Sequence, residues 1–190
     1  MSAGTEQATV DPAKHAVHFY RSNDDLAGRA ARYLGAALAA GETAIVLATP
    51  EHRRAIEARL AADCDVEAAR VAGSYIPLNA AEMMNLVMIG DRPDPASLDL
   101  VIGSLIRRAL AAGPAVRVYG EMSPLLWDAG HIGAALELET LWDRLSQELR
   151  LSSLCGYPAP LVSGPENAAA LRELCELHTA IAGRPHGSTA

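Results

Sequence analysis

Short continuous apolar runs alternate along the chain with longer segments in which apolar residues recur every three or four positions. Runs of the first kind are typical of strands buried on both faces of a parallel sheet, and the second pattern is typical of helices. Strands are predicted at residues 15–20, 43–48, 75–78, 116–119 and 151–157. The last of these predicted strands is closed by Pro158.

Helical spacing fills the segments between these strands. Helices are predicted at residues 22–41, 50–62, 79–87, 95–113, 123–150 with an interruption at Gly130, and 164–183, and a loop is predicted at 90–94. Strands that alternate with helices form right-handed βαβ units. We therefore expect an α/β fold with three layers, in which a mostly parallel sheet of about five strands carries helices on both faces. One domain is expected at residues 14–182, with flexible tails at 1–13 and 183–190.

Composition narrows the class of protein. The chain has 190 residues, half of them hydrophobic, which fits one domain with a sizeable core. The net charge of −7 argues against nucleic-acid binding, which needs a basic face. No apolar run reaches the ~18 residues of a membrane span, and the first ten residues lack the pattern of a signal peptide. A cytoplasmic protein without membrane contact is expected.

Cysteine and lysine usage excludes several kinds of chemistry. Cys64, Cys155 and Cys175 are widely spaced and form no CxxC, so neither a disulfide framework nor a thiolate zinc site is indicated. Cys175 and His178 are three residues apart on a predicted helix, which favours core packing over a metal pair. Lys14 is the only lysine and precedes the first strand, so a P-loop or Schiff-base lysine is not expected. Neither a cofactor nor a metal is predicted.

Parallel α/β folds bind ligands outside the carboxyl ends of their strands. Glu121 directly follows the fourth predicted strand, where a carboxylate can accept a hydrogen bond from a ligand. A cap for the following helix, or an ion pair with an arginine, would explain it equally well. His18 and Tyr20 are two residues apart on the first strand and therefore share one face. His18 can reach Glu121 if that face looks toward the crevice, and is otherwise a core residue.

The long predicted helix carries one carboxylate on its apolar side. On a helical wheel, Glu139 falls inside an arc that also holds Ala135, Leu138, Trp142 and Leu145. A partly buried carboxylate needs a partner or a raised pKa. Two interpretations stay open: a structural acid paired with an arginine among core tryptophans, or a ligand cavity that Glu139 lines with Trp142 and Trp127.

Several segments resemble those of one known family: HAVHFY with RSNDDL, GETAIVLATPEHRRAIEARL, GDRPDP, VRVYGEMSPLLWDAGHIGAALELETLWDRL and LCGYP. They resemble the MEDS (methanogen/methylotroph sensory) domain across residues 15–181. The resemblance implies a relative of RecA/KaiC-type P-loop ATPases that senses small organic molecules in signalling. Members of the family accompany DNA-binding, kinase or sigma-factor-regulating domains. Because too few residues precede Lys14 for a helix-turn-helix, direct control of transcription is not expected.

The first strand-to-helix loop departs from the P-loop pattern. Such relatives carry GxxxxGK[ST] there, but this loop has neither a glycine-rich cradle nor a lysine. Asp24 and Asp25 would also oppose a phosphate at the start of the helix. The sequence therefore predicts a degenerate site that does not hydrolyse ATP.

These expectations combine into a non-catalytic sensory module that binds a small organic ligand and reports to a regulatory protein, such as a kinase or a sigma-factor regulator. The candidate ligand-binding residues are His18, Tyr20, Glu121, Trp127, Glu139 and Trp142. Two alternatives stay open. A ligand-free adaptor predicts a filled core and an exposed apolar patch. A residual enzyme predicts a solvent-open hydrogen bond between His18 and Glu121, acting as base and acid.

Overall fold

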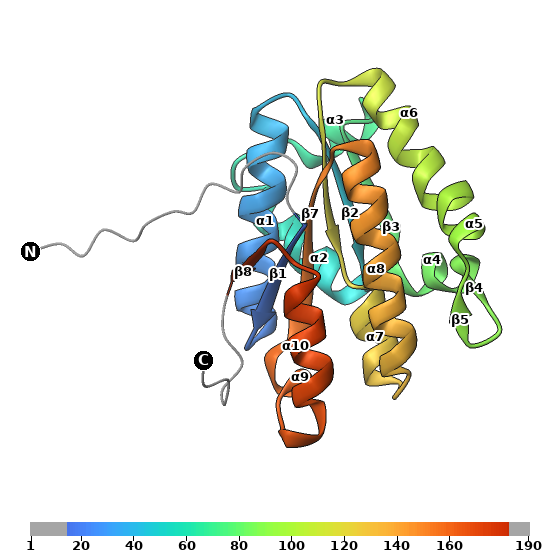
Figure 1. Cartoon of the computed structure of the whole chain (residues 1–190). Coiled ribbons are helices and arrows are strands. Elements are labelled where there is room, and N and C mark those ends of the chain that lie inside the picture. Colours follow the sequence, from blue (N-terminus) through green and yellow to red (C-terminus); the bar gives the residue numbers. More distant parts are fainter. Residues whose placement is uncertain (1–14, 183–190) are drawn as a thin grey trace, which may run out of the picture.

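The computed structural model describes residues 15–182, and both predicted tails lie outside the described residues. Its centre is a six-stranded sheet, parallel throughout, with the strand order β3-β2-β6-β7-β1-β8 (Figure 1). In that order the strands are Tyr75–Asn79, Thr43–Ala48, Val116–Gly120, Ser152–Pro158, His15–Tyr20 and Ala180–Ala182. The predicted α/β class and parallel sheet are confirmed.

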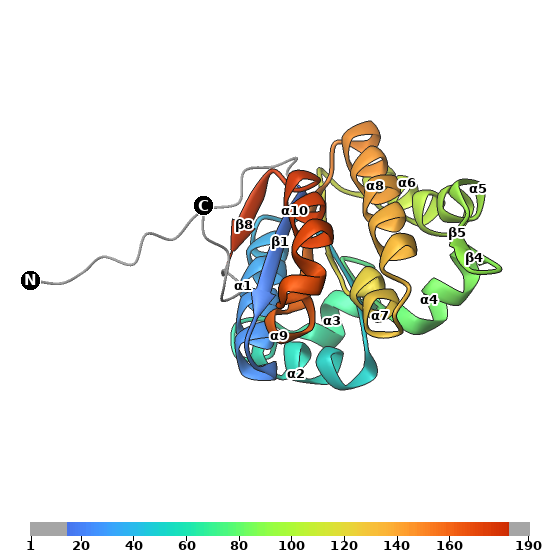
Figure 2. The same ribbon diagram turned by 60° about the horizontal axis from the view of Figure 1, so that its bottom comes forward.

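Helices cover both faces of the sheet (Figure 2). One face carries α1 (Asn23–Ala39), α2 (Pro50–Leu60) and α3 (Val66–Val71). The other carries α4 (Ala80–Val87), α5 (Pro95–Leu98), α6 (Ser104–Ala112), α7 (Met122–Asp128), α8 (Ile132–Leu149), α9 (Ala159–Val162) and α10 (Ala168–Glu176). A separate hydrophobic core lies on each side of the sheet. Between residues 15 and 182, no helix has the length and apolar character needed to cross a membrane.

The structure departs from the sequence prediction at the end of the described chain. The last helix, predicted to reach Gly183, ends at Glu176, and Ala180–Ala182 form the sixth strand instead. β8 has three residues, which are paired with Ala16–His18 of β1. So short a strand depends on its neighbour rather than on a local pattern, which explains why periodicity misses it.

Four smaller elements also differ from the predictions. The short strands β4 (Met88–Ile89) and β5 (Arg92–Pro93) form an antiparallel pair where a loop was expected. A π-helical turn at Asp99–Gly103 joins α5 to α6, and a 3-10 turn at Pro165–Asn167 precedes α10. The expected break in the long helical region is confirmed, because α7 ends at Asp128 and α8 begins at Ile132.

The connections create a topological switch point between β2 and β6. These neighbouring strands are parallel, so their carboxyl ends lie at the same edge of the sheet, at the bottom of Figure 1. The chain leaves β2 toward α2 on one face and leaves β6 toward α7 on the opposite face. The two connections diverge here, and open α/β sheets bind ligands at such switch points.

Candidate functional site

Glu121 lies at this switch point with its carboxylate almost fully buried, at 3% exposure. Its Oε2 accepts a hydrogen bond from the Thr49 amide at 3.2 Å, and its Oε1 accepts one from the Tyr119 hydroxyl at 2.9 Å. The Glu121 amide in turn donates to the Leu47 carbonyl at 2.9 Å. These bonds fasten the residue that follows β6 to the end of β2. The carboxylate thus has a fixed position at the edge of the sheet.

His52, in the first turn of α2, is the ionic partner of Glu121. Its Nδ1 lies 3.0 Å from both carboxylate oxygens, and its Nε2 lies 3.3 Å from Asn23 Oδ1. The Asn23 amide nitrogen donates to Glu51, which leaves the amide oxygen facing His52. Both neighbours of the ring then offer acceptor oxygens, an arrangement that favours a ring that donates from both nitrogens. The hydrogen bond with Glu121 accordingly raises the pKa of His52 above its usual value.

Tyr20, the last residue of β1, completes the group. Its ring lies edge-on to the His52 ring, with centroids 6.0 Å apart. Burial, together with the nearby Glu121 carboxylate, raises the pKa of the Tyr20 hydroxyl, which stays protonated. The group, called here the carboxyl-end cluster, comprises Tyr20, Asn23, Thr49, His52, Tyr119 and Glu121.

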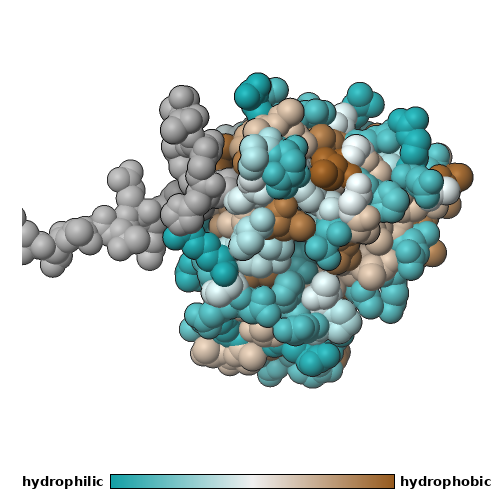
Figure 3. All heavy atoms as spheres, turned by 90° about the horizontal axis from the view of Figure 1, so that it is seen from below, coloured by the Kyte–Doolittle hydropathy of each residue, from teal (hydrophilic) through white to brown (hydrophobic). Residues whose placement is uncertain are grey.

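The carboxyl-end cluster is reachable from solvent. The His52 side chain is 16% exposed, whereas the carboxylate of Glu121 behind it is buried. Asn23 is exposed beside it. Figure 3 shows the end of the molecule where the strands finish, and its surface is mainly hydrophilic with small separate hydrophobic areas. A solute can therefore meet the imidazole edge, while the carboxylate that orients it stays shielded.

His18 shares a face with Tyr20, as predicted, with ring centroids 6.2 Å apart. Its Nε2 lies 3.5 Å from Asp25 Oδ1 of α1, and within the described residues no hydrogen bond joins it to Glu121. The expected pairing of His18 with Glu121 is therefore wrong. His18 is two residues before the end of β1, about 6.6 Å back along the strand, so it faces the first turn of α1 instead. Burial lowers the pKa of His18.

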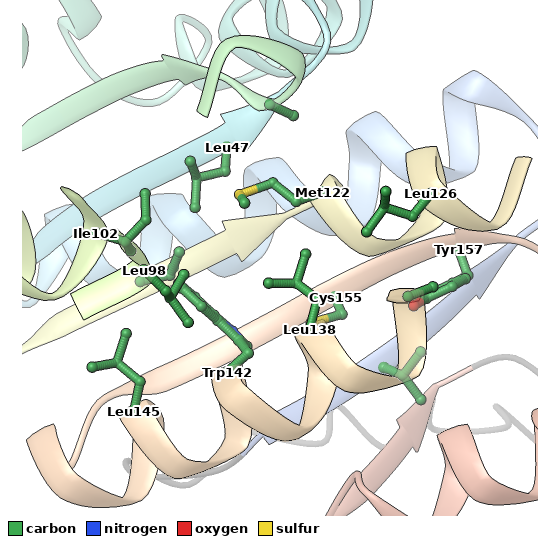
Figure 4. Packing of buried hydrophobic residues seen from close by; sticks show 14 of the residues in the cluster. Leu47, Leu98, Ile102, Met122, Leu126, Leu138, Trp142, Leu145, Cys155 and Tyr157 are labelled. Carbon is green, nitrogen blue, oxygen red and sulfur yellow. The ribbon is translucent and has the colours of Figure 1, made fainter. Parts of the chain in front are cut away.

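The remaining three predicted site residues lie on the opposite face of the sheet. Trp127 packs edge-on against Tyr157, with centroids 5.9 Å apart. Trp142 belongs to the core with Leu98 and Ile102 (Figure 4). Glu139 and Trp142 line a cavity of about 20 Å³, which has room for about one water molecule. Its other lining residues are Leu47, Gly120, Met122, Ser123, Leu138 and Cys155.

Glu139 is 1% exposed and has partners other than the arginine considered from the sequence. The Tyr157 hydroxyl donates to its Oε1 at 2.8 Å, and His15 Nε2 lies 3.2 Å from its Oε2. His178 Nε2 lies 3.6 Å from the same oxygen. Burial by itself would raise the pKa of Glu139, but hydrogen bonding to His15 and the charge of the two histidines hold it at about 2.

The sequence matches the family described as the methanogen/methylotroph, DcmR sensory domain (MEDS) over residues 14–179. The chain belongs to the MEDS family. A comparison with curated proteins finds no match. Membership of a sensory-domain family implies a role in sensing or signalling for this MEDS domain.

The first strand-to-helix turn of the MEDS domain is occupied by its own carboxylates. Ser22 caps α1 by accepting from the Asp25 amide at 3.1 Å, and Asp25 accepts from the Arg21 amide at 3.1 Å. Asp24 pairs with Arg59 of α2. Acids therefore lie at the helix N-terminus where a phosphate would bind in a P-loop enzyme.

Sequence reasoning overlooked His52, although a local signal was present. The residue follows the capping pair Thr49-Pro50 at the carboxyl end of a predicted strand, and Thr49 Oγ1 accepts from the His52 amide at 3.3 Å. A polar residue in the first turn of that helix faces the strand ends. The meeting of His15 with His178 carried no such signal, because it depends on the unpredicted pairing of β8 with β1.

Proposed function

We propose that this MEDS domain is a non-catalytic sensor that binds a small organic molecule at the carboxyl-end cluster and reports its presence to a regulatory protein. The observation that supports the proposal is the buried Glu121 carboxylate, joined to the partly exposed His52 imidazole at the switch point of the sheet. Ligand sites are mostly apolar with a few fixed polar groups. Here the Tyr20 ring supplies an apolar wall, and His52 with Asn23 supplies the polar edge.

The hydrogen bonds of the cluster offer a route from binding to signal. They join the β1–α1 turn through Asn23, the start of α2 through His52 and the end of β6 through Glu121. A ligand that hydrogen-bonds His52 competes with Asn23 for the same ring edge. Occupancy then favours a different placement of α1 relative to α2. Such a shift requires that the ligand bind one placement more tightly than the other.

Within this proposal the six sequence candidates take different roles. Tyr20 and Glu121 belong to the ligand site, together with His52 and Asn23, and His18 lies just behind them beside Asp25. We assign the other candidates to packing against the opposite face of the sheet, since they lie on α7 and α8. Those candidates are Trp127, Glu139 and Trp142.

The adaptor alternative has one observation in its favour. Leu86, Ile89 and Leu100 are 55%, 65% and 72% exposed, and they lie on α4, β4 and the π-helical turn. Exposed apolar side chains on consecutive elements are suited to a protein partner. In a sensor these residues would form the surface that meets the regulatory protein, so the two functions differ in whether a ligand controls that contact.

Native mass spectrometry of the purified chain tests the proposal. We expect a small organic molecule to accompany the wild-type protein, and we expect His52→Gln to weaken its retention by about tenfold or more, which corresponds to 1.4 kcal/mol. His131→Gln is the matched control, because His131 is exposed at the start of α8, on the other face of the sheet. A molecule retained equally by His52→Gln would contradict a site at the carboxyl-end cluster.

A further inference from the structure

Four buried side chains with metal-binding atoms meet on the α8 face of the sheet. They are His15 at the start of β1, Glu139 on α8, Cys155 on β7, and His178 between α10 and β8. Their donor atoms all lie within 4.8 Å of one another. Figure 4 shows Cys155 pointing from β7 toward Leu138 of α8. The four residues are far apart in the sequence, so the fold has to assemble the group.

The distances match those between the corners of a tetrahedral metal site. His15 Nε2 lies 3.2 Å from Cys155 Sγ and 3.2 Å from Glu139 Oε2. Cys155 Sγ lies 3.5 Å from Glu139 Oε2, and His178 Nε2 lies 3.6 Å from the same oxygen. Metal–ligand bonds of about 2.0–2.3 Å arranged as a tetrahedron separate neighbouring ligands by roughly 3.3–3.7 Å. Four of the six separations are therefore close to those of a tetrahedral site, and the other two are no longer than 4.8 Å.

The outer nitrogen of His178 has an acceptor, which turns its inner nitrogen toward the group, and the outer nitrogen of His15 faces a carboxylate beyond hydrogen-bond distance. His178 Nδ1 lies 2.7 Å from the Leu174 carbonyl, and a carbonyl only accepts, so this nitrogen carries the proton. His178 Nε2 is buried and has no hydrogen-bond partner among residues 15–182. His15 Nδ1 lies 3.6 Å from Asp143 Oδ1. Metal-binding histidines characteristically present one nitrogen to the metal and the other to a carbonyl or a carboxylate.

Charge also favours a cation at this position. His178 Nε2 faces the Glu139 carboxylate at 3.6 Å, while the proton of the ring lies on Nδ1. Two acceptors in contact repel each other in a buried site unless a proton or a metal lies between them. A divalent cation bound to the Glu139 carboxylate and the Cys155 thiolate would make the buried group neutral overall. Binding to Cys155 would require the thiol to release its proton.

A route for the metal exists at the amino ends of the strands. A cavity of about 280 Å³ lies there, and its lining includes His15 and Asp143. The other lining residues are Ser146, Gln147, Arg150, Leu151 and Thr179. This cavity is at the end of the sheet opposite the carboxyl-end cluster, so metal and sensory ligand would enter separately.

We propose that His15, Glu139, Cys155 and His178 bind one divalent transition-metal ion in tetrahedral geometry, and that Zn²⁺ is the ion this donor set favours. All four positions are protein ligands, which is typical of a structural site rather than a catalytic one. The metal would join β1, β7 and α8 to the turn that leads into β8. It would thereby stabilise the edge of the sheet formed by the short last strand.

Titration with Co²⁺ tests the proposal on the full-length chain, purified without an affinity tag and treated with a chelator. We expect one equivalent to bind, with the intense visible bands of tetrahedral Co²⁺, a thiolate-to-metal charge-transfer band, and displacement by Zn²⁺. Cys155→Ser should lose the charge-transfer band. Cys175→Ser is the matched control, since Cys175 is a half-buried cysteine on α10 outside the group, and it should keep the band.

Two further measurements guard against variants that fail to fold. His178→Gln should weaken Zn²⁺ binding by about 100-fold or more, whereas His52→Gln on the other face should leave it unchanged. Zn²⁺ should raise the melting temperature of the wild-type chain above that in chelator, which requires no variant. The proposal is overturned if the folded wild type binds no Co²⁺ and melts identically with Zn²⁺ and with chelator. A charge-transfer band that persists in folded Cys155→Ser overturns it equally.

Discussion

Two carboxylates are buried on opposite faces of the same sheet, and their surroundings differ. Glu121 sits at the edge of the sheet, with a backbone amide, a hydroxyl and one partly exposed histidine as its donors. Glu139 sits under α8 in the core, where a tyrosine and two buried histidines surround it. The Glu121 group meets solvent through the partly exposed His52, whereas Glu139, His15 and His178 are all buried.

Because the two groups differ in solvent access, the pKa of the histidine is shifted in opposite directions in them. At the carboxyl-end cluster, the hydrogen bond with Glu121 raises the pKa of His52. In the core, burial outweighs the nearby Glu139 and lowers the pKa of His178. The same pair of residue types thus gives an accessible histidine with a raised pKa at one place and a buried histidine with a lowered pKa at the other. The first arrangement suits an exchangeable ligand, and the second suits a permanent part of the core.

Glu139→Leu should produce the largest loss of stability and would test the core side of the comparison. The change removes the acceptor for the Tyr157 hydroxyl and the carboxylate that faces His15 Nε2, leaving buried polar groups without these partners. Removing one member of a buried charged pair costs about 3–5 kcal/mol. Urea unfolding in the presence of chelator measures the protein contacts alone.

Glu137→Leu is the control for that experiment, because Glu137 on the same helix pairs with the exposed Arg92. An exposed ion pair of this kind is worth at most about 1 kcal/mol. If Glu139→Leu proved as stable as the wild type, the carboxylate would not be a structural partner, and its place in the core would need a ligand to explain it.

Gly156→Ala should destabilise the fold less than Glu139→Leu does, and it should act on the group around Glu121. A Cβ at Gly156 would overlap the hydroxyl of Tyr119 and lie 3.0 Å from its Cζ. Tyr119 is fully buried and donates to Glu121, so the ring has no free space to enter. Overpacking of this kind costs about 1–3 kcal/mol. It should also loosen the Glu121–His52 contact.

The control for this substitution is Gly133→Ala in α8, where an added Cβ meets nothing within 4 Å. That change should be neutral or stabilising by about 0.5–1 kcal/mol, since alanine favours the helix. Differential scanning calorimetry of the two variants gives the comparison. Equal melting temperatures would mean that the Tyr119 ring is not tightly packed against β7.

The pH dependence of stability should separate the two histidines. The folded pKa of His52 lies above the unfolded value, so its bond to Glu121 stabilises the fold below the unfolded pKa and loses this effect as pH rises through the folded pKa. His52→Gln should therefore destabilise the chain by about 1 kcal/mol near pH 6, and by less at about pH 9.

His178 should behave in the opposite sense. Its folded pKa is lowered, so its contribution is present above the unfolded pKa and is lost as pH falls through the folded pKa. Titration of the histidine ring protons by NMR in chelator should show a midpoint for His52 above the unfolded value and one for His178 below it. Midpoints in the reverse order would remove the contrast on which the comparison rests.

Arg107→Ala should have the smallest effect. Arg107 bridges Asp99 and Glu148 at the surface, where all three side chains are well exposed. Solvent screens such pairs, so the free energy of unfolding should change by less than about 1 kcal/mol. A loss as large as that of Glu139→Leu would show that burial does not decide which charges matter in this molecule.

The hydrophobic pattern predicts most strands of the sheet, but it does not predict which side chains meet on each of its two faces. Thr43–Ala48 is buried along its whole length, and its unbroken apolar run signals a central parallel strand. Glu139 was placed in the core by helical spacing alone, and the structure buries it. Its partners could not be read in the same way, because His15 and His178 are brought together by the three-residue strand β8.

For the candidate site, too, the sequence predicts single residues but not how they group in space. Glu121 was found because it follows a predicted strand, and the switch point explains its position. The sequence places Tyr20 and Trp127 among the candidates for one ligand site. In the structure they lie on opposite faces of the sheet. Which face a residue takes after a strand ends depends on the direction of the next helix. That direction follows from strand order, which composition and periodicity do not contain.

The most direct test of the central claim is a two-dimensional ¹H–¹⁵N NMR screen of the labelled chain against a library of small organic molecules. The account predicts that binding molecules shift the amides of Tyr20, Asn23, Thr49, His52 and Glu121, while the amides near Trp142 on α8 stay in place. Hits that collect around Trp142, or hits whose shifts persist unchanged in Tyr20→Ala and His52→Gln, would contradict a sensory site at the carboxyl-end cluster.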